Sequence, residues 1–470
     1  MSAGTKMQQY IFEIPYIEPE RAFSVFADDD GAIFFDSSDK NSPHAKYSFI
    51  GFSPMETIIH RDGKTEINNR EFSLKFRGNP FQVIEKRLAV WREITKLSDK
   101  SPMPFSGGAA GFFSYQLARH FEKLPNIAHD DMNVPDMAIG IYDQVIGFDL
   151  KKQKAYFCTI AKDAKAAEAS LSRASARLNN FKHHVSNSHN PEWSRQKTRD
   201  EYKQDIQTVI NYIHAGDVFQ VNLTQKFTAT LPDYFNPYAH YLRLRKVNPA
   251  PFSSFMRMGD IVLSSTSPER FLKVSDSKIE TRPIKGTIAD SEHPSTLLSS
   301  SKDRAENTMI VDLLRNDLSK VCEANSIQVP ELCAIESYSG LHHLVSSVTG
   351  KLKKDKTALD ALSACFPGGS ITGAPKIRAM EIIEELEPTR RGAYCGAIGY
   401  IGFDGTMDTN IAIRTLIYKD NQVSLSVGGG IVAGSQLEAE YQETLVKARK
   451  IFESFEAESK ETPAKIAQQG

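Results

Sequence analysis

The chain has 470 residues, 40% of them hydrophobic and 24% charged, and its 57 lysines and arginines nearly balance 58 aspartates and glutamates. This composition is typical of a globular protein, and the net charge of −1 argues against a basic surface that binds nucleic acid or an anionic membrane. No apolar run approaches the roughly 20 residues that span a bilayer, and the N-terminus lacks the charged-then-apolar order of a signal peptide. The five cysteines are scattered without a CxxC pair, which indicates reduced thiols and predicts a cytoplasmic protein.

Residues 1–181 predict a β-rich region. Alternating stretches such as AIFFDSS (32–38) and PDMAIGIYDQVIGFD (135–149) predict strands, and an alanine-rich stretch near 162–181 predicts a helix. The polar segment 182–197 has no periodicity and predicts a linker. A second region then runs from 198 to 456, and residues 457–470 form a polar tail.

The second region has sharper signals. TRDEYKQDIQTVINYIHAGD (198–217) begins with a capping box of Thr198 and Glu201 and closes on Gly216, which predicts a helix. The following DVFQVNLTQKFTATL alternates in polarity and predicts a strand. Further strands are expected at 261–266, 271–274, 396–403, 411–418 and 423–427, and helices at 301–319, 357–364, 375–386 and 435–456. The pattern predicts an α+β fold on antiparallel sheets, and no GxGxxG or Walker loop indicates a nucleotide site.

Two of the expected helices carry acidic pairs. Asp303 and Glu306 are three residues apart, and Glu440 and Glu443 share a helix face with Lys447. Such carboxylates suit a hard cation such as Mg²⁺. Taken alone, each pair is better explained as a solvated helix face, with an ion pair between Glu443 and Lys447. The helix from 435 is also expected to begin with a capping box of Ser435 and Glu438.

Two glycine-rich segments precede helices. FPGGSITGAPK leads into Pro375 at a helix start, where free N–H groups can bind a carboxylate. SVGGGIVAGS places three glycines between a strand and the acidic helix. Arg414, on the strand expected at 411–418, could bind a carboxylate, and a structural ion pair is an equal alternative. Together these pieces suit a small dianionic substrate.

An ordered set of motifs identifies a family. GDVFQVNL, SPERF, RPIKGT, KDRAEN, HHLVS, FPGGSITGAPKIRAMEII, GYIGFDGTMDTNIAIRT and GGGIVAGSQLEAEYQET closely resemble the chorismate-utilising enzymes, whose branches make anthranilate, aminodeoxychorismate, isochorismate and salicylate. The resemblance is dense over 198–455 and looser over 105–149. It implies a large two-lobed fold in which antiparallel sheets pack face to face with helices outside.

The resemblance also implies site residues and Mg²⁺ as cofactor. The expected metal ligands are Glu306, Glu440 and Glu443, with Asp303 nearby. The expected substrate-binding residues are Thr372, Gly373, Ala374, Tyr394, Arg414, Gly428, Gly429, Gly430 and Lys447. Glu269 and His343 are the candidates for general acid and base work, although His343 by itself would pass for an ordinary buried histidine.

Two positions distinguish the branches. Gln220 stands where the isochorismate and salicylate branch has a water-activating lysine, so addition of water is disfavoured. Lys285 stands where the anthranilate branch typically has alanine and the aminodeoxychorismate branch has a lysine that attacks ring C2 and expels the C4 hydroxyl. A free lysine, with a pKa of about 10.4, is neutral in roughly one molecule in 2,500 at pH 7. Burial and a nearby cation such as Arg282 would lower that pKa.

The resemblance therefore implies an aminotransferase reaction: Mg²⁺-dependent amination of chorismate at C4 through a covalent lysine adduct, giving 4-amino-4-deoxychorismate for p-aminobenzoate and folate synthesis. No glutaminase segment is fused to the motifs, so a separate glutamine amidotransferase subunit (component II) is expected to supply ammonia. No lyase segment follows, so aromatisation is expected to need another enzyme. The alternatives are ortho amination with pyruvate loss, as in anthranilate synthase component I, and a non-catalytic ligand-sensing relative.

A tryptophan pocket is a further trait of the family. Its expected walls in this chain are Ser37, Pro249, Pro251 and Phe252. The loop between 38 and 46 departs from the pattern of the feedback-regulated members, so binding and regulation by tryptophan both stay open.

Overall fold

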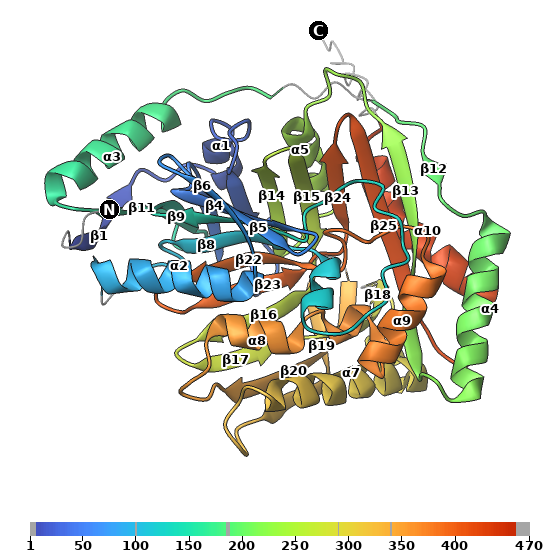
Figure 1. Cartoon of the computed structure of the whole chain (residues 1–470). Helices are drawn as coiled ribbons and strands as arrows, with labels where there is room; N and C mark the ends of the chain where they lie inside the picture. The colour runs from blue at the N-terminus through green and yellow to red at the C-terminus, as the bar shows by residue number, and fades with distance from the viewer. Residues whose placement is uncertain (1–5, 99–100, 185–188, 290, 339–340, 457–470) are drawn as a thin grey trace, which may run out of the picture.

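The computed structural model describes residues 6–98, 101–184, 189–289, 291–338 and 341–456. The expected tail at 457–470 and part of the expected linker (185–188) lie outside these ranges. Two large, almost entirely antiparallel sheets form the centre of the molecule, with helices around them (Figure 1). The predicted α+β class on antiparallel sheets is confirmed.

The first sheet has 13 strands. In spatial order they are β12 (Ser194–Arg195), β13 (Gln220–Thr230), β25 (Gln422–Ile431), β24 (Thr415–Lys419), β15 (Ile261–Ser267), β14 (Phe252–Met258), β2 (Ile33–Asp36), β3 (Tyr47–Gly51), β10 (Gln144–Asp149), β11 (Lys154–Ala161), β1 (Met7–Ile14) and β7 (Thr95–Lys96). The two-residue β21 (Gly373–Ala374) pairs with β13 beside this path.

The second sheet has 12 strands. In spatial order they are β18 (Ile284–Ala289), β20 (Leu341–Lys351), β17 (Lys278–Thr281), β16 (Arg270–Ser275), β23 (Met407–Ile411), β22 (Ala397–Gly402), β8 (Gly108–Phe113), β9 (Met137–Tyr142), β4 (Glu56–Arg61), β5 (Lys64–Asn69) and β6 (Ser73–Arg77). β19 (Gln328–Tyr338) pairs with β20 beside this path.

Both sheets contain strands from before and after the expected linker. In the first sheet β2 pairs with β14, and in the second β8 pairs with β22. Each sheet is therefore continuous across the two regions that the sequence distinguishes. The boundaries at 181 and 198 stay a prediction.

An aromatic core lies between the sheets. Phe49 of β3 and Tyr400 of β22 have ring centroids 5.6 Å apart, and Phe105 stacks on Tyr400 at 4.4 Å. All three rings are buried in one cluster with aliphatic side chains from both sheets. Aromatic pairs in such offset and edge-to-face arrangements add to the free energy gained from burial, so this cluster binds one sheet to the other.

Helices cover the outer faces of the sheets. The helices that share one hydrophobic cluster with the first sheet are α1 (Pro19–Phe23), α3 (Ala164–Leu178), α5 (Pro237–Val247) and α10 (Leu437–Glu453). The others are α2 (Pro80–Ile94), α4 (Arg199–Ala215), α6 (Ser295–Ser299), α7 (Ser301–Ser319), α8 (Ala358–Cys365) and α9 (Lys376–Leu386), with short 3₁₀ turns η1 (Tyr115–His120) and η2 (Gly369–Ile371). Most of the longer helices present an apolar stripe to a sheet and a polar face to water.

The helix ends test two capping predictions. Thr198 and Glu201 form the predicted capping box of α4, and Gly216 ends that helix with φ of 85°. The capping box predicted for Ser435 is wrong, because α10 begins at Leu437 and Gln436 makes no side-chain cap. The Ser435 hydroxyl instead donates to the Glu440 carboxylate at 2.6 Å.

The strand expected at 411–418 is two strands. β23 ends at Ile411 in the second sheet and β24 begins at Thr415 in the first, so the chain changes sheets between them. Arg414 therefore lies at a crossing rather than in a strand, with a positive φ of 51°. Its carbonyl accepts the N–H of Thr266 at 3.1 Å, which holds the crossing against β15.

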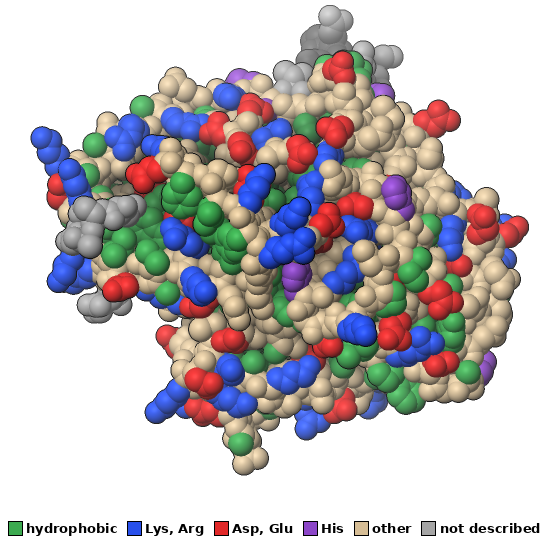
Figure 2. Space-filling model, viewed as in Figure 1, with side chains coloured by type: hydrophobic (Ala, Val, Ile, Leu, Met, Phe, Trp, Pro, Cys, Tyr) green, Lys and Arg blue, Asp and Glu red, His purple; other side chains and the backbone are tan. Residues whose placement is uncertain are grey.

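The surface carries mixed charge. Figure 2 shows lysine and arginine side chains interspersed with aspartate and glutamate over the face in view. Among the described residues, no helix combines the length and the apolar character needed to cross a bilayer.

Candidate active site

The Lys285 side chain lies where β18 meets the η2 turn. Its amine donates to the carbonyl oxygen of Ser370 at 3.2 Å. Burial lowers the pKa of the amine and Lys447 lowers it further, while Glu306 and Glu269 act in the opposite direction. The net result is a lowered pKa, so a larger fraction of Lys285 is neutral than for a solvated lysine.

Arg282 pairs with glutamates, whereas the sequence analysis expected it to lower the pKa of Lys285. Its guanidinium pairs with Glu336, with Glu331 at 2.8 Å and with Glu280 at 3.6 Å. Three carboxylates thus surround the arginine charge. Lys447 is the cation that acts on Lys285 in the role expected for Arg282.

Glu269 lies next to Lys285, between β15 and β16. It is buried, and its carboxylate accepts hydrogen bonds from the Ser370 hydroxyl and the Ile284 N–H. Burial raises the pKa of Glu269 to about 7, although these bonds and Lys285 oppose the rise. Ser370 therefore contacts both Lys285 and Glu269, a role that the sequence analysis missed although the residue lies in the GGSITGAP motif.

A carboxylate cluster lies between α7 and α10. Glu440 is buried and accepts hydrogen bonds from Ser435 at 2.6 Å and Lys302 at 3.3 Å. Glu443 pairs with Lys447 at 2.7 Å, as the sequence allowed. Lys302, four residues before Glu306, is a second member of the site that the sequence analysis did not single out.

Charges within this cluster alter each other's ionisation. Burial, followed by Asp303 and Glu440, raises the pKa of Glu306 against the opposing charges of Lys285 and Lys302. For Glu443, burial would raise the pKa, but Lys447 and the other lysines reverse the effect and lower it. The carboxylates and ammonium groups therefore form one electrostatic unit that includes Lys285.

Gly429 provides space for this unit. A β-carbon at Gly429 would lie 3.5 Å from Glu443 Oε1, 3.6 Å from Glu440 Oε2 and 3.7 Å from Lys447 Nζ. The Lys447 amine also donates to the carbonyl of Gly428 at 2.9 Å. The glycines thus bring α10 and its charged face close to β25.

The three glycines that the sequence places between a strand and the acidic helix lie inside the strand instead. Gly428, Gly429 and Gly430 lie within β25 and pair with β13, and Gly373 and Ala374 form β21 on the other side of β13. A β-carbon at Gly373 would lie only 2.1 Å from the Gln220 carbonyl oxygen. Glycine is thus required there by the close approach of the backbones.

Two buried amides flank these strands. In the described part of the chain, no group hydrogen-bonds to either side-chain polar atom of Gln220 or to Nδ2 of Asn222. A β-carbon at Gly430 would lie 2.2 Å from Gln220 Nε2, so the amide occupies the space above that glycine. Buried polar groups normally have partners, so these amides are free to bond a ligand or ordered water.

His343 and Arg414 form a second group near β18, the strand that carries Lys285. His343 is buried and its Nδ1 lies 2.9 Å from the hydroxyl of Thr287, two residues after Lys285 in β18. Burial and then Arg414 lower the pKa of His343 to about 4. His343 is therefore neutral at pH 7.

Thr372 and Tyr394 are buried in the segments behind the site. The Thr372 hydroxyl donates to the Gly368 carbonyl at 3.1 Å. Tyr394 lies in the apolar core, and burial raises the pKa of its phenol well above the ordinary range. Thr372 is thus bonded to the η2 turn, and Tyr394 is part of the hydrophobic core.

Of the residues expected to form a tryptophan pocket, Ser37 and Pro251 are in contact. The Ser37 hydroxyl donates to the Tyr47 carbonyl at 2.7 Å and to the Pro251 carbonyl at 3.3 Å, while Pro249 and Phe252 are partly exposed. Phe252 also lines a small pocket. The pocket's other walls are His44, Pro268, Arg270, Arg282, Ile284, Glu336 and Val345. Pro268, Arg270 and Ile284 are direct sequence neighbours of Glu269 and Lys285, so this pocket lies behind the catalytic candidates.

A buried ion pair connects the η2 turn to β13. Arg391 forms a bidentate pair with Glu387 and donates to the carbonyls of Ile371 at 3.0 Å and Asn222 at 2.7 Å. Both charged groups are almost fully buried. Arg391 thereby ties the turn that carries Ser370 to β13.

Replacing Arg391 by alanine should lower the free energy of unfolding by about 3–5 kcal/mol, because Glu387 would be left charged and unpaired in the interior. Urea unfolding followed by fluorescence measures the loss. Arg378→Ala is the matched control, since Arg378 is partly exposed and pairs with Asp217 at the surface. That control should change the stability by less than about 1 kcal/mol. Equal losses in the two variants would contradict the role given to Arg391.

Known proteins resemble this chain over most of its length. A family described as chorismate binding enzyme matches residues 30–453. Aminodeoxychorismate synthase component 1 of Escherichia coli (strain K12) is 42% identical over 432 residues, which cover 90% of this chain and 93% of that protein. Anthranilate synthase component 1 of Thermus thermophilus is 34% identical over 93% of this chain and 95% of that protein. The solved structure of anthranilate synthase component I from Streptococcus pneumoniae TIGR4 superposes with a TM-score of 0.78 at 33% identity, covering 88% of this chain and 93% of that one.

Proposed function

Because the chain belongs to the chorismate-binding enzyme family, we propose that it converts chorismate and ammonia to 4-amino-4-deoxychorismate and water. The observation that carries this choice is the Lys285 amine, which is partly buried, has a lowered pKa and shares Ser370 with Glu269. The 42% identity to an aminodeoxychorismate synthase component 1 also supports it.

Lys285 is the nucleophile in this proposal. Its neutral amine attacks ring C2 of chorismate, the ring double bond shifts, and the bond between C4 and its hydroxyl breaks. Ammonia then adds at C4, the double bond returns, and the C2–N bond to Lys285 breaks. Each cycle consumes one ammonia, releases one water and restores the free lysine.

Glu269 fits the proton donor for the departing hydroxyl. Its pKa of about 7 means that much of it holds a proton near neutral pH, and it lies beside Lys285. Once ionised, it can take a proton from the ammonia that adds at C4. His343, with a pKa of about 4, fits a proton acceptor or an orienting group better than a donor.

The carboxylate cluster fits Mg²⁺. Glu306, Glu440 and Glu443 offer only oxygen ligands, which Mg²⁺ prefers. Burial is the main cause of the raised pKa of Glu306, with Asp303 and Glu440 contributing, and a bound cation would favour its ionised form. When bound, the metal would hold and neutralise a carboxylate of the substrate. Lys447 and Arg414 are the cationic side chains best placed to receive the remaining substrate charge.

Ammonia is proposed to come from a separate glutamine amidotransferase subunit. The designation component 1 of the E. coli relative implies a second component in that enzyme. The product retains its enolpyruvyl group in this proposal, so p-aminobenzoate would require a further lyase.

The competing activity is that of anthranilate synthase component I, which relatives at 33–34% identity carry as their name. Chorismate, Mg²⁺ and an ammonium salt distinguish the two reactions. The proposal expects a product that gives p-aminobenzoate only after a lyase is added. Direct appearance of fluorescent anthranilate would establish ortho amination, and binding without turnover would indicate a ligand-sensing protein.

The rate of adduct formation should depend on pH in a bell shape. On the acid side it rises with pH as Lys285 loses its proton, which the lowered pKa shifts below the usual range for lysine. On the alkaline side it falls because Glu269 no longer holds the proton that it must donate, and Glu269, with a pKa of about 7, contributes one of the two inflections. Mixing enzyme with chorismate in the absence of ammonia, and quenching for mass spectrometry, isolates this step from the titration of ammonium.

The Glu269→Gln variant checks the assignment. The amide does not titrate, so the alkaline limb should disappear while the rate drops by about 10²–10⁴-fold. An alkaline limb that persists in this variant would show that another group donates the proton.

A further inference from the structure

A second cluster of ligating side chains lies far along the chain from the carboxylate cluster. His60 of β4, His120 at the end of η1 and Asp136 just before β9 place their ligating atoms within 4.8 Å of one another. Across the described residues, this is the one group of three or more histidine, cysteine, aspartate or glutamate side chains that meets this spacing. Three protein ligands from three separate segments are the usual basis of a zinc site that keeps one open position.

The two histidines face each other through the same nitrogen. His60 Nε2 and His120 Nε2 are 2.6 Å apart, and the rings are inclined by 76°. His60 is fully buried and its other nitrogen lies 2.7 Å from the hydroxyl of Thr65, its cross-strand neighbour in β5. A partner on the second nitrogen fixes the ring orientation in the way common to metal-bound histidines.

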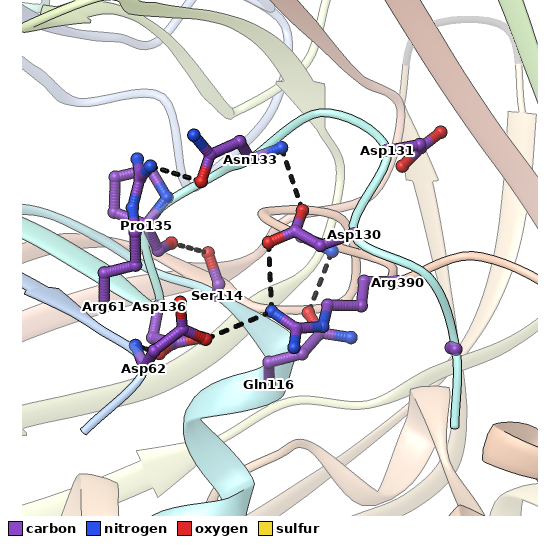
Figure 3. Close-up of polar contacts among 12 residues, drawn as sticks. Arg61, Asp62, Ser114, Gln116, Asp130, Asp131, Asn133, Pro135, Asp136 and Arg390 are labelled. Carbon is purple, nitrogen blue, oxygen red and sulfur yellow. Dashed lines mark hydrogen bonds and ion pairs between the residues drawn. The ribbon is translucent and has the colours of Figure 1, made fainter. Parts of the chain in front are cut away.

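Asp136 is held in the same place by the backbone. Its Oδ2 accepts the N–H of Asp62 at 3.0 Å, and its carbonyl accepts the N–H of Ser114 at 2.8 Å. Figure 3 shows Asp136 beside Asp62, with Arg390 between the carboxylates of Asp62 and Asp130. The direct ion pairs of Arg390 are with Asp62 at 3.5 Å and Asp130 at 3.0 Å, and its charge reaches Asp136 only over a longer distance.

The electrostatics of the cluster favour a metal over protons. Burial, followed by His120, lowers the pKa of His60 to about 4, and burial lowers that of His120. The two neutral imidazoles share one hydrogen bond between their Nε2 atoms, which a metal ion would replace. Burial raises the pKa of Asp136, while the hydrogen bond from the Asp62 N–H and the charges of Arg390 and Arg119 lower it.

We propose that His60, His120 and Asp136 bind one Zn²⁺ or a similar borderline divalent ion, with one coordination position left open. Two imidazole nitrogens and one carboxylate oxygen match the ligand preferences of zinc and cobalt, whereas Mg²⁺ prefers oxygen alone. In tetrahedral geometry with bonds of about 2.0–2.1 Å, the two nitrogens would be roughly 3.4 Å apart. His120 is partly exposed and ends a short 3₁₀ turn, so it can make this movement of under about 1 Å and also gives the ion a path from solvent.

A bound ion would link three segments of the chain: strand β4, the end of η1 and the residue just before β9. It is chemically separate from the carboxylate cluster that suits Mg²⁺. Its occupancy does not depend on the proposed reaction, so either proposal can fail without the other.

Cobalt and zinc titrations of the untagged, chelator-treated full chain test the proposal. We expect one equivalent of Co²⁺ to give the visible absorption of a four-coordinate site, and Zn²⁺ to displace it and to raise the melting temperature reversibly. His120→Ala should lower the affinity at least about 100-fold, and Thr65→Val about 10-fold through the orientation of His60. Saturating Mg²⁺ should not compete.

Two controls separate this site from other ligands. His129→Ala removes an exposed histidine near the cluster, and a Glu440→Gln, Glu443→Gln double variant disables the carboxylate cluster; both should retain the cobalt spectrum. Weak binding without the four-coordinate spectrum, or a spectrum that survives His120→Ala, would overturn the proposal and leave the two histidines as a hydrogen-bonded pair.

Discussion

Replacing Lys285 by alanine is expected to abolish the covalent adduct with chorismate and to lower the rate of C4 amination by at least about a thousandfold, because no other amine would attack ring C2. Intact mass spectrometry of the wild-type chain with chorismate and Mg²⁺, without ammonia, should show an added mass equal to chorismate minus water. The variant should show none. Addition of ammonium salt should discharge the adduct from the wild type.

Lys278→Ala is the matched control for this experiment. Lys278 lies in the same sheet, at the exposed start of β17, and should neither form nor affect the adduct. Peptide mapping of the adduct to Lys285 would complete the assignment. An adduct that survives in Lys285→Ala would remove the lysine from its role, and a wild-type chain that aminates C4 without any trapped species would favour direct attack by ammonia.

Replacing Glu440 by glutamine should raise the Mg²⁺ concentration needed for half-maximal activity by at least about 100-fold. Loss of a residue that only orients a metal ligand typically lowers metal affinity by about 10–100-fold, and Glu440 is proposed as a direct ligand. The carboxylate is buried against Ser435 and Lys302, so glutamine keeps its size while removing its charge. Activity measured against Mg²⁺ at saturating chorismate gives the shift.

Glu438→Gln provides the control on the same helix. Glu438 is exposed, and its pKa is lowered to about 2 by bonds from Gln442 and Arg199 on the outward face of α10. That variant should leave the magnesium dependence unchanged. An equal shift in both variants would mean that the helix acts through its total charge rather than through a ligand.

Local sequence signals predicted the helices that carry the site. α7 spans Ser301–Ser319, as the periodicity indicates, and the helical spacing of Glu440, Glu443 and Lys447 correctly puts them on one face. Four helices among the described residues were not anticipated: the short α1 and α6, and the longer α2 and α5. Both α2 and α5 begin with an asparagine cap followed by proline, at Asn79 and Asn236. That pair of residues is a helix-start signal that outweighs the weak apolar period which follows.

Contacts between distant segments could not be predicted in the same way. Ser370 bonds to Lys285 across a separation of 85 residues, which no local pattern in the sequence reports. Arg414 looks like a strand residue by alternation, yet the chain changes sheets there. The place of Arg282 was also unpredictable, since three glutamates from β17 and β19 neutralise it only in the folded sheet. The pattern of apolar and polar residues predicts single helices and strands, whereas these three features depend on how the strands are connected and paired.

The sharing of both sheets between distant parts of the chain has a consequence for its synthesis. Ser38, directly after β2, bonds to Ser253 in β14, 215 residues later. At translation rates of 5–20 residues per second, β2 waits roughly 10–40 s for its neighbour. During that time one edge of a buried, phenylalanine-rich strand is unpaired. The nascent chain should therefore depend on chaperones until its last third has emerged, and fragments that end before β14 should aggregate rather than fold.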